Sequence, residues 1–139
     1  MRLLSILVIS FTVLLSTGCS KGSSINGRSY KTALKSVSMI KDRLPQQQRI
    51  PFELSFWAIR TKYRKNEDFL DIVGGKTPDE LIAVGKEVFD TRKTEGFAEY
   101  QQYATWEDMI QKYTDDRRAQ NAKKKRDPRE GENSVLYKL

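Results

Sequence analysis

Cys19 is the only cysteine of the chain, and it closes an N-terminal segment with the three parts of an export signal. Arg2 supplies a positive charge, residues 3–15 are mostly apolar, and small residues precede the cysteine. Small exported folds often depend on disulfides, which a single cysteine cannot form within one chain. We therefore expect the fold after this segment to depend on an apolar core alone.

The four residues Ser16-Thr17-Gly18-Cys19 resemble the lipobox of bacterial lipoproteins. The resemblance implies that the bond between Gly18 and Cys19 is cut. It also implies that the cysteine sulfur carries diacylglycerol and that the new amino terminus carries a fatty acyl chain such as palmitate. Residues 1–18 are then a signal peptide, and residues 19–24 are a lipidated N-terminus and linker. No cofactor is expected beyond this covalent lipid.

The same resemblance implies a location in the cell envelope. Ser20 follows the cysteine, whereas an Asp at this position tends to retain Gram-negative lipoproteins in the inner membrane. In a Gram-negative source we therefore expect the outer membrane, with the protein facing the periplasm. The apolar run of residues 3–15 is shorter than the roughly 20 residues that span a bilayer, so the expected anchor is the lipid and not a helix.

Charge divides the remaining chain into two parts. Residues 20–116 hold 16 basic and 15 acidic side chains, whereas residues 117–139 hold 8 basic and 3 acidic ones. We interpret residues 25–116 as the folded domain and residues 117–139 as a basic, flexible and partly disordered tail. The side chains in this tail that we expect to contact an anionic surface are Arg117, Arg118, Lys123, Lys124, Lys125 and Arg126.

Apolar residues recur at spacings of three and four through the domain, which is the pattern of amphipathic helices. The pattern predicts one helix over residues 29–44 and a second that starts at Pro45, or near Ile50 if Pro51 interrupts it, and ends near Lys65. The second is apolar around most of its circumference. We interpret its aromatic side chains as core packing: Phe52, Phe56, Trp57 and Tyr63.

The sharpest local signal is a helix start at Thr77. Thr77 can cap the helix, Pro78 suits its first position, and Glu80 can complete a capping box. This predicts a helix over residues 78–89, followed by a turn over residues 90–96.

The letters before that start, Gly74-Gly75-Lys76-Thr77, also resemble the end of a phosphate-binding loop. Leu70 stands where that motif requires its first glycine, and no hydrophobic strand precedes it. We therefore interpret the run as a helix start only.

A last apolar stripe covers residues 97–113 and is rich in aromatic side chains. Thr105 with Asp108 can restart the helix within it. We interpret the stripe first as core packing and second as a surface for a partner. Together the stripes predict an all-α fold, a small bundle of three to four helices.

The order of these signals is similar to that in a family of small uncharacterised all-helical bacterial lipoproteins. The resemblance rests on the lipobox, on Leu44-Pro45-Gln46-Gln47-Gln48-Arg49 and on Gly75-Lys76-Thr77-Pro78-Asp79-Glu80-Leu81-Ile82. It covers residues 19–89. It implies an all-helical fold and brings no activity and no site residues.

Catalysis is disfavoured because the chain has no histidine and its one thiol is expected to carry lipid. We predict no catalytic residue, no metal site and no enzymatic activity. A small cell-wall hydrolase, using the carboxylates of Glu67, Asp68 and Asp71, is the least favoured alternative.

The leading hypothesis is a non-catalytic, lipid-anchored envelope protein that binds an envelope protein partner. The alternative is a module that binds an anionic membrane or cell-surface polymer through its basic tail. Nucleic acid is a poor candidate because the chain is exported. Residues 135–139 are more apolar than an ordinary tail. We favour a frayed terminus there, and the alternative is that this segment docks on the domain or on another protein.

Overall fold

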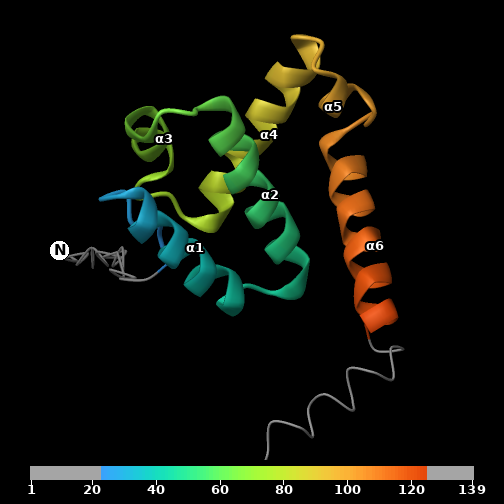
Figure 1. Cartoon of the computed structure of the whole chain (residues 1–139), viewed down its shortest axis with the longest axis horizontal. Helices are drawn as coiled ribbons and strands as arrows, with labels where there is room; N and C mark the ends of the chain where they lie inside the picture. The colour runs from blue at the N-terminus through green and yellow to red at the C-terminus, as the bar shows by residue number, and fades with distance from the viewer. Residues whose placement is uncertain (1–22, 125–139) are drawn as a thin grey trace, which may run out of the picture.

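The structure, a computed structural model, describes residues 23–124 of the chain. This part contains six helices and no strand, so the all-α prediction is confirmed (Figure 1). Four of the helices have 14 or more residues, in line with the expected number of long helices, and the other two are short. The helices are α1 (Tyr30–Arg43), α2 (Gln46–Lys62), α3 (Asn66–Val73), α4 (Pro78–Thr94), α5 (Ala98–Gln101) and α6 (Trp106–Lys124).

The predicted helix start at Thr77 is confirmed. Its backbone N–H donates to the Glu80 carboxylate at 2.8 Å, and its hydroxyl accepts from the Glu80 N–H at 3.5 Å. The Glu80 carboxylate also accepts from the Thr77 hydroxyl at 2.9 Å, and the two bonds that Thr77 donates favour its charged form, so the pKa of this carboxyl lies below the usual value. The first helix uses the same device, a capping box between Ser29 and Thr32.

Helix α2 runs through Pro51 without a break, so the start at Pro45 is closer to the structure than the start near Ile50. Because proline has no backbone N–H, one of the backbone hydrogen bonds of this helix is missing at Pro51. The Ser55 hydroxyl donates to the Pro51 carbonyl at 2.7 Å, which supplies a polar contact one turn later.

Helix α3 was not among the predicted elements. It has only eight residues, yet Phe69 and Val73 are fully buried on its inner face. Helix α4 is also longer than predicted and continues to Thr94, so the predicted turn is confined to its end, where Gly96 adopts a φ of 83°. A non-glycine residue is strained at such a φ, which explains why a glycine stands at the position where the chain changes direction.

The main core lies between α1, α2, α3 and α4. Helices α2 and α4 approach closely because Gly85 faces Ser55; a Cβ at position 85 would lie 2.3 Å from the Ser55 Oγ. Edge-to-face packing of Phe56 on Phe69, with ring centroids 5.1 Å apart, connects α2 to α3. The largest fully buried side chains of this core are Phe52, Phe56, Phe69, Ile25, Ile59, Leu81 and Val73.

The segment before α1 is fixed to the loop between α3 and α4. The Ile25 N–H donates to the Lys76 carbonyl at 2.9 Å, and the Gly75 N–H donates to the Ile25 carbonyl at 2.8 Å. Gly27 and Gly74 lie so close that a Cβ on Gly27 would be 2.7 Å from the Gly74 Cα. The two glycines before Thr77 therefore have structural roles: both make backbone contacts with the segment before α1. These roles agree with the interpretation of the run as a helix start.

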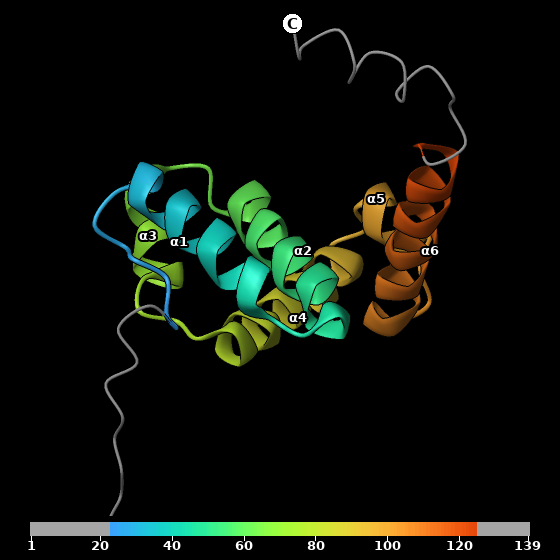
Figure 2. The ribbon, with the colours of Figure 1, turned by 90° about the horizontal axis from the view of Figure 1, so that it is seen from below.

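A second, smaller core joins the end of α4 to α5 and α6. Phe89 packs edge-to-face on Tyr100 and Trp106, with ring centroids 5.8 Å apart in both pairs. Both views place α5 and α6 at the end of the molecule opposite the segment before α1 (Figures 1 and 2). Within residues 23–124, no helix is long and apolar enough to cross a membrane.

Candidate functional site

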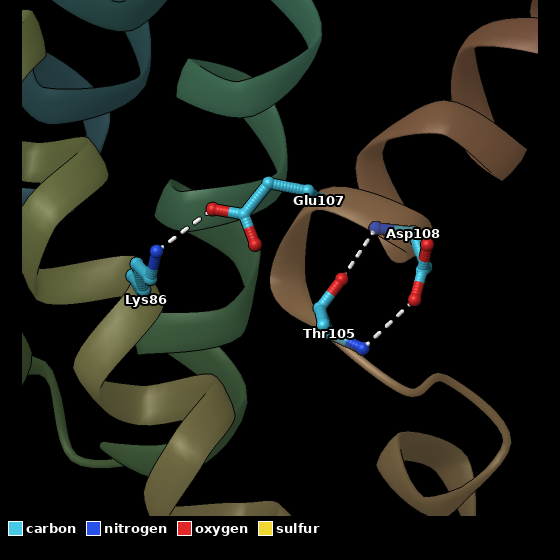
Figure 3. A network of polar contacts seen from close by, with 4 residues as sticks. All are labelled: Lys86, Thr105, Glu107 and Asp108. Carbon is cyan, nitrogen blue, oxygen red and sulfur yellow. Dashed lines mark hydrogen bonds and ion pairs between the residues drawn. The ribbon is translucent and has the colours of Figure 1, made fainter.

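Helix α6 begins at a capping pair that the sequence predicted. The Thr105 N–H donates to the Asp108 carboxylate at 3.0 Å, and the Asp108 N–H donates to the Thr105 hydroxyl at 3.1 Å (Figure 3). From α4, the Lys93 ammonium donates to the carbonyls of Tyr103 and Ala104 in the preceding loop, the latter at 2.6 Å. These contacts fix the direction in which α6 leaves the second core.

An exposed ion pair adds a further link between α4 and α6. The Lys86 Nζ lies 2.7 Å from the Glu107 Oε1 (Figure 3). The pairing raises the pKa of the Lys86 ammonium and lowers the pKa of the Glu107 carboxyl, since each charge favours the ionised form of the other. Both side chains are solvated, so this link orients α6 more than it stabilises the fold.

Helix α6 runs back along α2, and these two helices together with α5 line a groove of about 90 Å³ that we call the aromatic groove. Trp57 of α2 and Tyr113 of α6 both line it, and they remain 44% and 42% exposed. The lining is completed by Leu54, Ala58, Thr61, Glu99, Tyr100, Tyr103 and Met109. Two large aromatic side chains thus stay partly open to solvent in one concave place.

Two of the buried side chains that line the aromatic groove are tyrosines, Tyr100 and Tyr103. Burial raises the pKa of Tyr100 and of Tyr103 above the usual value of 10.0. Both side chains are therefore neutral at physiological pH and bring no charge to the lining.

A second hollow, of about 310 Å³, lies between the N-terminal half of α2 and the C-terminal half of α6. We call it the polar groove. It is lined by Gln46, Gln47, Ile50, Ile110, Gln111, Thr114, Arg117, Arg118 and Asn121. Along α6 the side that faces α2 thus changes from aromatic to polar and cationic.

Glu53 of α2 connects three helices beside these grooves. Its carboxylate lies 3.4 Å from the Lys41 ammonium of α1 and 3.5 Å from the Arg117 guanidinium of α6. Arg117 was predicted as a contact for an anionic surface. In the structure it pairs with Glu53 and helps to hold α6 against the bundle.

The other predicted basic residues are distributed along α6 and beyond it. The Arg118 guanidinium lies 3.6 Å from the Asp115 carboxylate of the same helix, and Lys123 is exposed near the helix end. The boundary predicted at Arg117 thus falls inside α6, which continues to Lys124. Five of the predicted positions lie outside the residues whose side chains the structure describes: Gly18, Cys19, Lys124, Lys125 and Arg126.

Most of the predicted aromatic stripe is core, as the first interpretation held. Tyr100, Tyr103, Trp106 and Met109 are buried, whereas Phe97 and Tyr113 are exposed. The Arg92 guanidinium lies 4.1 Å from the centroid of the Phe97 ring, so the two exposed ends of the stripe differ: Phe97 has a cation on one face, and Tyr113 lines the aromatic groove.

Trp57 was interpreted as core packing, and this was wrong. Phe52 and Phe56 of the same helix are fully buried, but Trp57 stays exposed at the mouth of the groove. A helix that is apolar on all sides gives no periodic signal for its outer face, so the sequence pattern could not identify the exposed residue.

The carboxylates considered for hydrolysis lie on α3. Glu67 and Asp68 occupy its first turn, where negative charge stabilises a helix N-terminus, and both are exposed. Asp71 lines a different hollow together with Lys62 and Lys76. In residues 23–124, no group of three or more metal-ligating side chains could hold a metal ion.

Comparison with known proteins returned no relative: the chain matches no protein-family model, no curated protein and no solved structure.

Proposed function

We propose that this chain is a lipid-anchored, non-catalytic protein of the cell envelope that binds a protein partner through the aromatic groove. The observation that carries the proposal is the pair Trp57 and Tyr113, which are about half exposed and line one groove. Large aromatic side chains in a concave surface, with polar groups at the rim, are the usual anchors of protein–protein contacts.

The place of the groove in the molecule supports this choice of partner. The segment around Ile25 lies at the opposite end from α5 and α6, as both views of the ribbon show (Figures 1 and 2). A lipid on Cys19 would be joined to that segment by the five residues 20–24, which reach about 17 Å when extended. The anchor would then lie at one end of the domain and the groove at the other, facing away from the anchoring membrane.

The alternative role, contact with an anionic surface through the basic residues, receives less support. Arg117 and Arg118 both have carboxylate partners in the structure, Glu53 and Asp115, so part of the predicted positive patch is compensated within the domain. Their place on α6, at the end of the domain away from Ile25, also favours a surface other than the membrane of the anchor (Figure 1).

The test is site-specific photo-crosslinking in intact cells. A photoreactive amino acid in place of Trp57 should crosslink to one envelope protein. The control is the same photoreactive amino acid in place of Met39. Met39 is 43% exposed on α1, as open as Trp57 but outside the groove. Equal crosslinking from both positions, or none from position 57, would reject the groove as a partner site. Loss of the Cys19→Ala protein from the membrane fraction tests the anchor separately.

A further inference from the structure

The aromatic groove brings two exposed aromatic side chains together. Of the four exposed large hydrophobic side chains among the described residues, Trp57 and Tyr113 share this one groove. The other two, Phe97 under the Arg92 guanidinium and Met39 on α1, do not line it. An open aromatic pair is costly in water, because each buried square ångström of apolar surface gains about 25 cal/mol.

The chain itself supplies a segment that fits this surface. Fifteen residues follow α6, and four of the last five are apolar or aromatic: Val135, Leu136, Tyr137 and Leu139. The ten residues before them, 125–134, contain no large apolar side chain. The apolar end is therefore a short anchor on a polar tether.

The tether is long enough to return to the groove. Tyr113 lies eleven residues before the end of α6, a distance of about 16 Å along a helix. Ten extended residues span about 33 Å, twice what is needed. Pro128 and Gly131 lie within the tether, and both residue types suit a reversal of chain direction.

The tether is neutral overall, because Lys125, Arg126 and Arg129 balance its three acidic residues, but those three can meet cationic side chains on the way. The polar groove lies between the end of α6 and the aromatic groove, and it is lined by Arg117 and Arg118. The tether carries the three acidic residues of the basic tail, and they lie between the basic run and the apolar end: Asp127, Glu130 and Glu132. A returning tether thus brings carboxylates past guanidinium groups before its apolar end reaches Trp57.

We propose that residues 135–139 bind in the aromatic groove of their own chain and that a partner must displace them. Displacement by a partner rests on the proposed function, whereas the intrachain contact does not depend on any partner. Because the segment is tethered, its effective concentration at the groove is about millimolar, so even a weak contact is populated. The C-terminus is then a built-in competitor that sets a threshold for partner binding.

Crosslinking within the full-length, membrane-anchored protein tests the contact directly. A benzophenone amino acid in place of Tyr137 should link to the peptides that carry Trp57 or Tyr113 of the same chain. Leu136→Ser combined with Leu139→Ser should abolish the link, whereas the matched change Lys138→Ser should keep it. A link to a second copy, a link to another protein, or no link to the groove overturns the proposal.

Fluorescence gives a second readout. In a Trp106→Phe chain, Trp57 is the only tryptophan that remains. Deleting residues 135–139 should shift its emission to longer wavelength and increase quenching by acrylamide. Unchanged emission and quenching after the deletion contradict the proposal.

The two proposals fail in different ways. If the groove binds no partner, position 57 captures no envelope protein with or without residues 135–139, while the intrachain link from position 137 remains. If the segment does not occupy the groove, the link from position 137 is absent, while capture from position 57 is unaffected by the deletion. If both proposals hold, the deletion increases capture from position 57.

Discussion

Gly85 of α4 lies directly against Ser55 of α2, so that a Cβ added at position 85 would meet the Ser55 Oγ, Cβ and Cα at 2.3, 2.4 and 2.7 Å. Alanine would gain about 1 kcal/mol in helix propensity over glycine. Overpacking of a tight core costs about 1–3 kcal/mol, and here the Ser55 backbone is among the atoms that must shift. We expect Gly85→Ala to lower the free energy of unfolding by a net value of about 1–2 kcal/mol, because strain in the upper part of that range exceeds the propensity gain.

Urea denaturation of the two chains measures this difference. Glu87→Ala, on the exposed side of the same helix, is the matched control and should change stability by less than about 0.5 kcal/mol. A stabilised Gly85→Ala chain would mean that α2 and α4 separate more easily than the contact implies.

The outcome at α2 and α4 illustrates which features sequence patterns can predict. Capping at Thr77 and Thr105 and the stripe of α1 involve residues within one turn of each other, so local spacing was sufficient. Gly85 carried no such signal, because its role depends on Ser55, thirty positions earlier in the chain. Helix α3 was missed for a related reason: it is only eight residues long, too short for a clear period.

The candidate site was predicted less well than the fold. The aromatic groove is formed by α2, α5 and α6 together, and whether Trp57 faces the core or the solvent depends on where α6 lies. Arg117 was predicted from its place in a basic run, but its partner Glu53 lies on another helix. Both properties are relations between distant segments, which composition and local spacing do not contain.

The Glu53–Arg117 pair should couple α2 to α6 weakly. Arg117 is about half exposed, so the coupling free energy is expected to be about 0.5 kcal/mol and to fall as salt increases. A double-mutant cycle with Glu53→Gln and Arg117→Gln, read by urea denaturation, measures it. Arg118→Gln is the control, since Arg118 pairs with Asp115 and should show no coupling to Glu53. A cycle that closes to zero at low salt would remove the pair from the contacts that hold α6.

Lys93 and Lys86 both reach from α4 towards α6, but we expect different effects when they are replaced. Lys93 donates to the carbonyls of Tyr103 and Ala104, so Lys93→Met leaves these acceptors without their charged donor. Lys86 makes one exposed pair with Glu107. Lys93→Met should therefore increase amide hydrogen exchange in α6 more than Lys86→Met does. Equal exchange in the two variants would contradict this.

Tyr100 should make the protein less stable at alkaline pH. Burial raises the pKa of its hydroxyl above 10.0 in the folded chain, so the unfolded chain loses the proton first. The stability that this group contributes is full below the unfolded pKa of about 10 and is lost as pH rises towards the higher folded value. In Tyr100→Phe, this part of the decline above pH 10 should disappear. Thermal unfolding of both chains across that range measures the slopes, and parallel slopes would assign the decline to other groups.

Stability and partner binding should separate at the aromatic groove. Trp57 and Tyr113 are 44% and 42% exposed, whereas Trp106 is 5% exposed in the second core. Replacing a buried aromatic side chain costs about 3–5 kcal/mol, but a half-exposed one loses much less packing when it is truncated. We therefore expect the double change Trp57→Ser and Tyr113→Ser to fold and unfold nearly as the unchanged chain does, while capture of the envelope partner is lost. Trp106→Ser should instead reduce the stability of the fold and also lose capture of the partner. Thermal unfolding, together with crosslinking from a photoreactive group at Thr61 in the groove wall, separates the two effects. If the double variant keeps its partner, the two exposed aromatic side chains serve another purpose and the groove is not the docking surface.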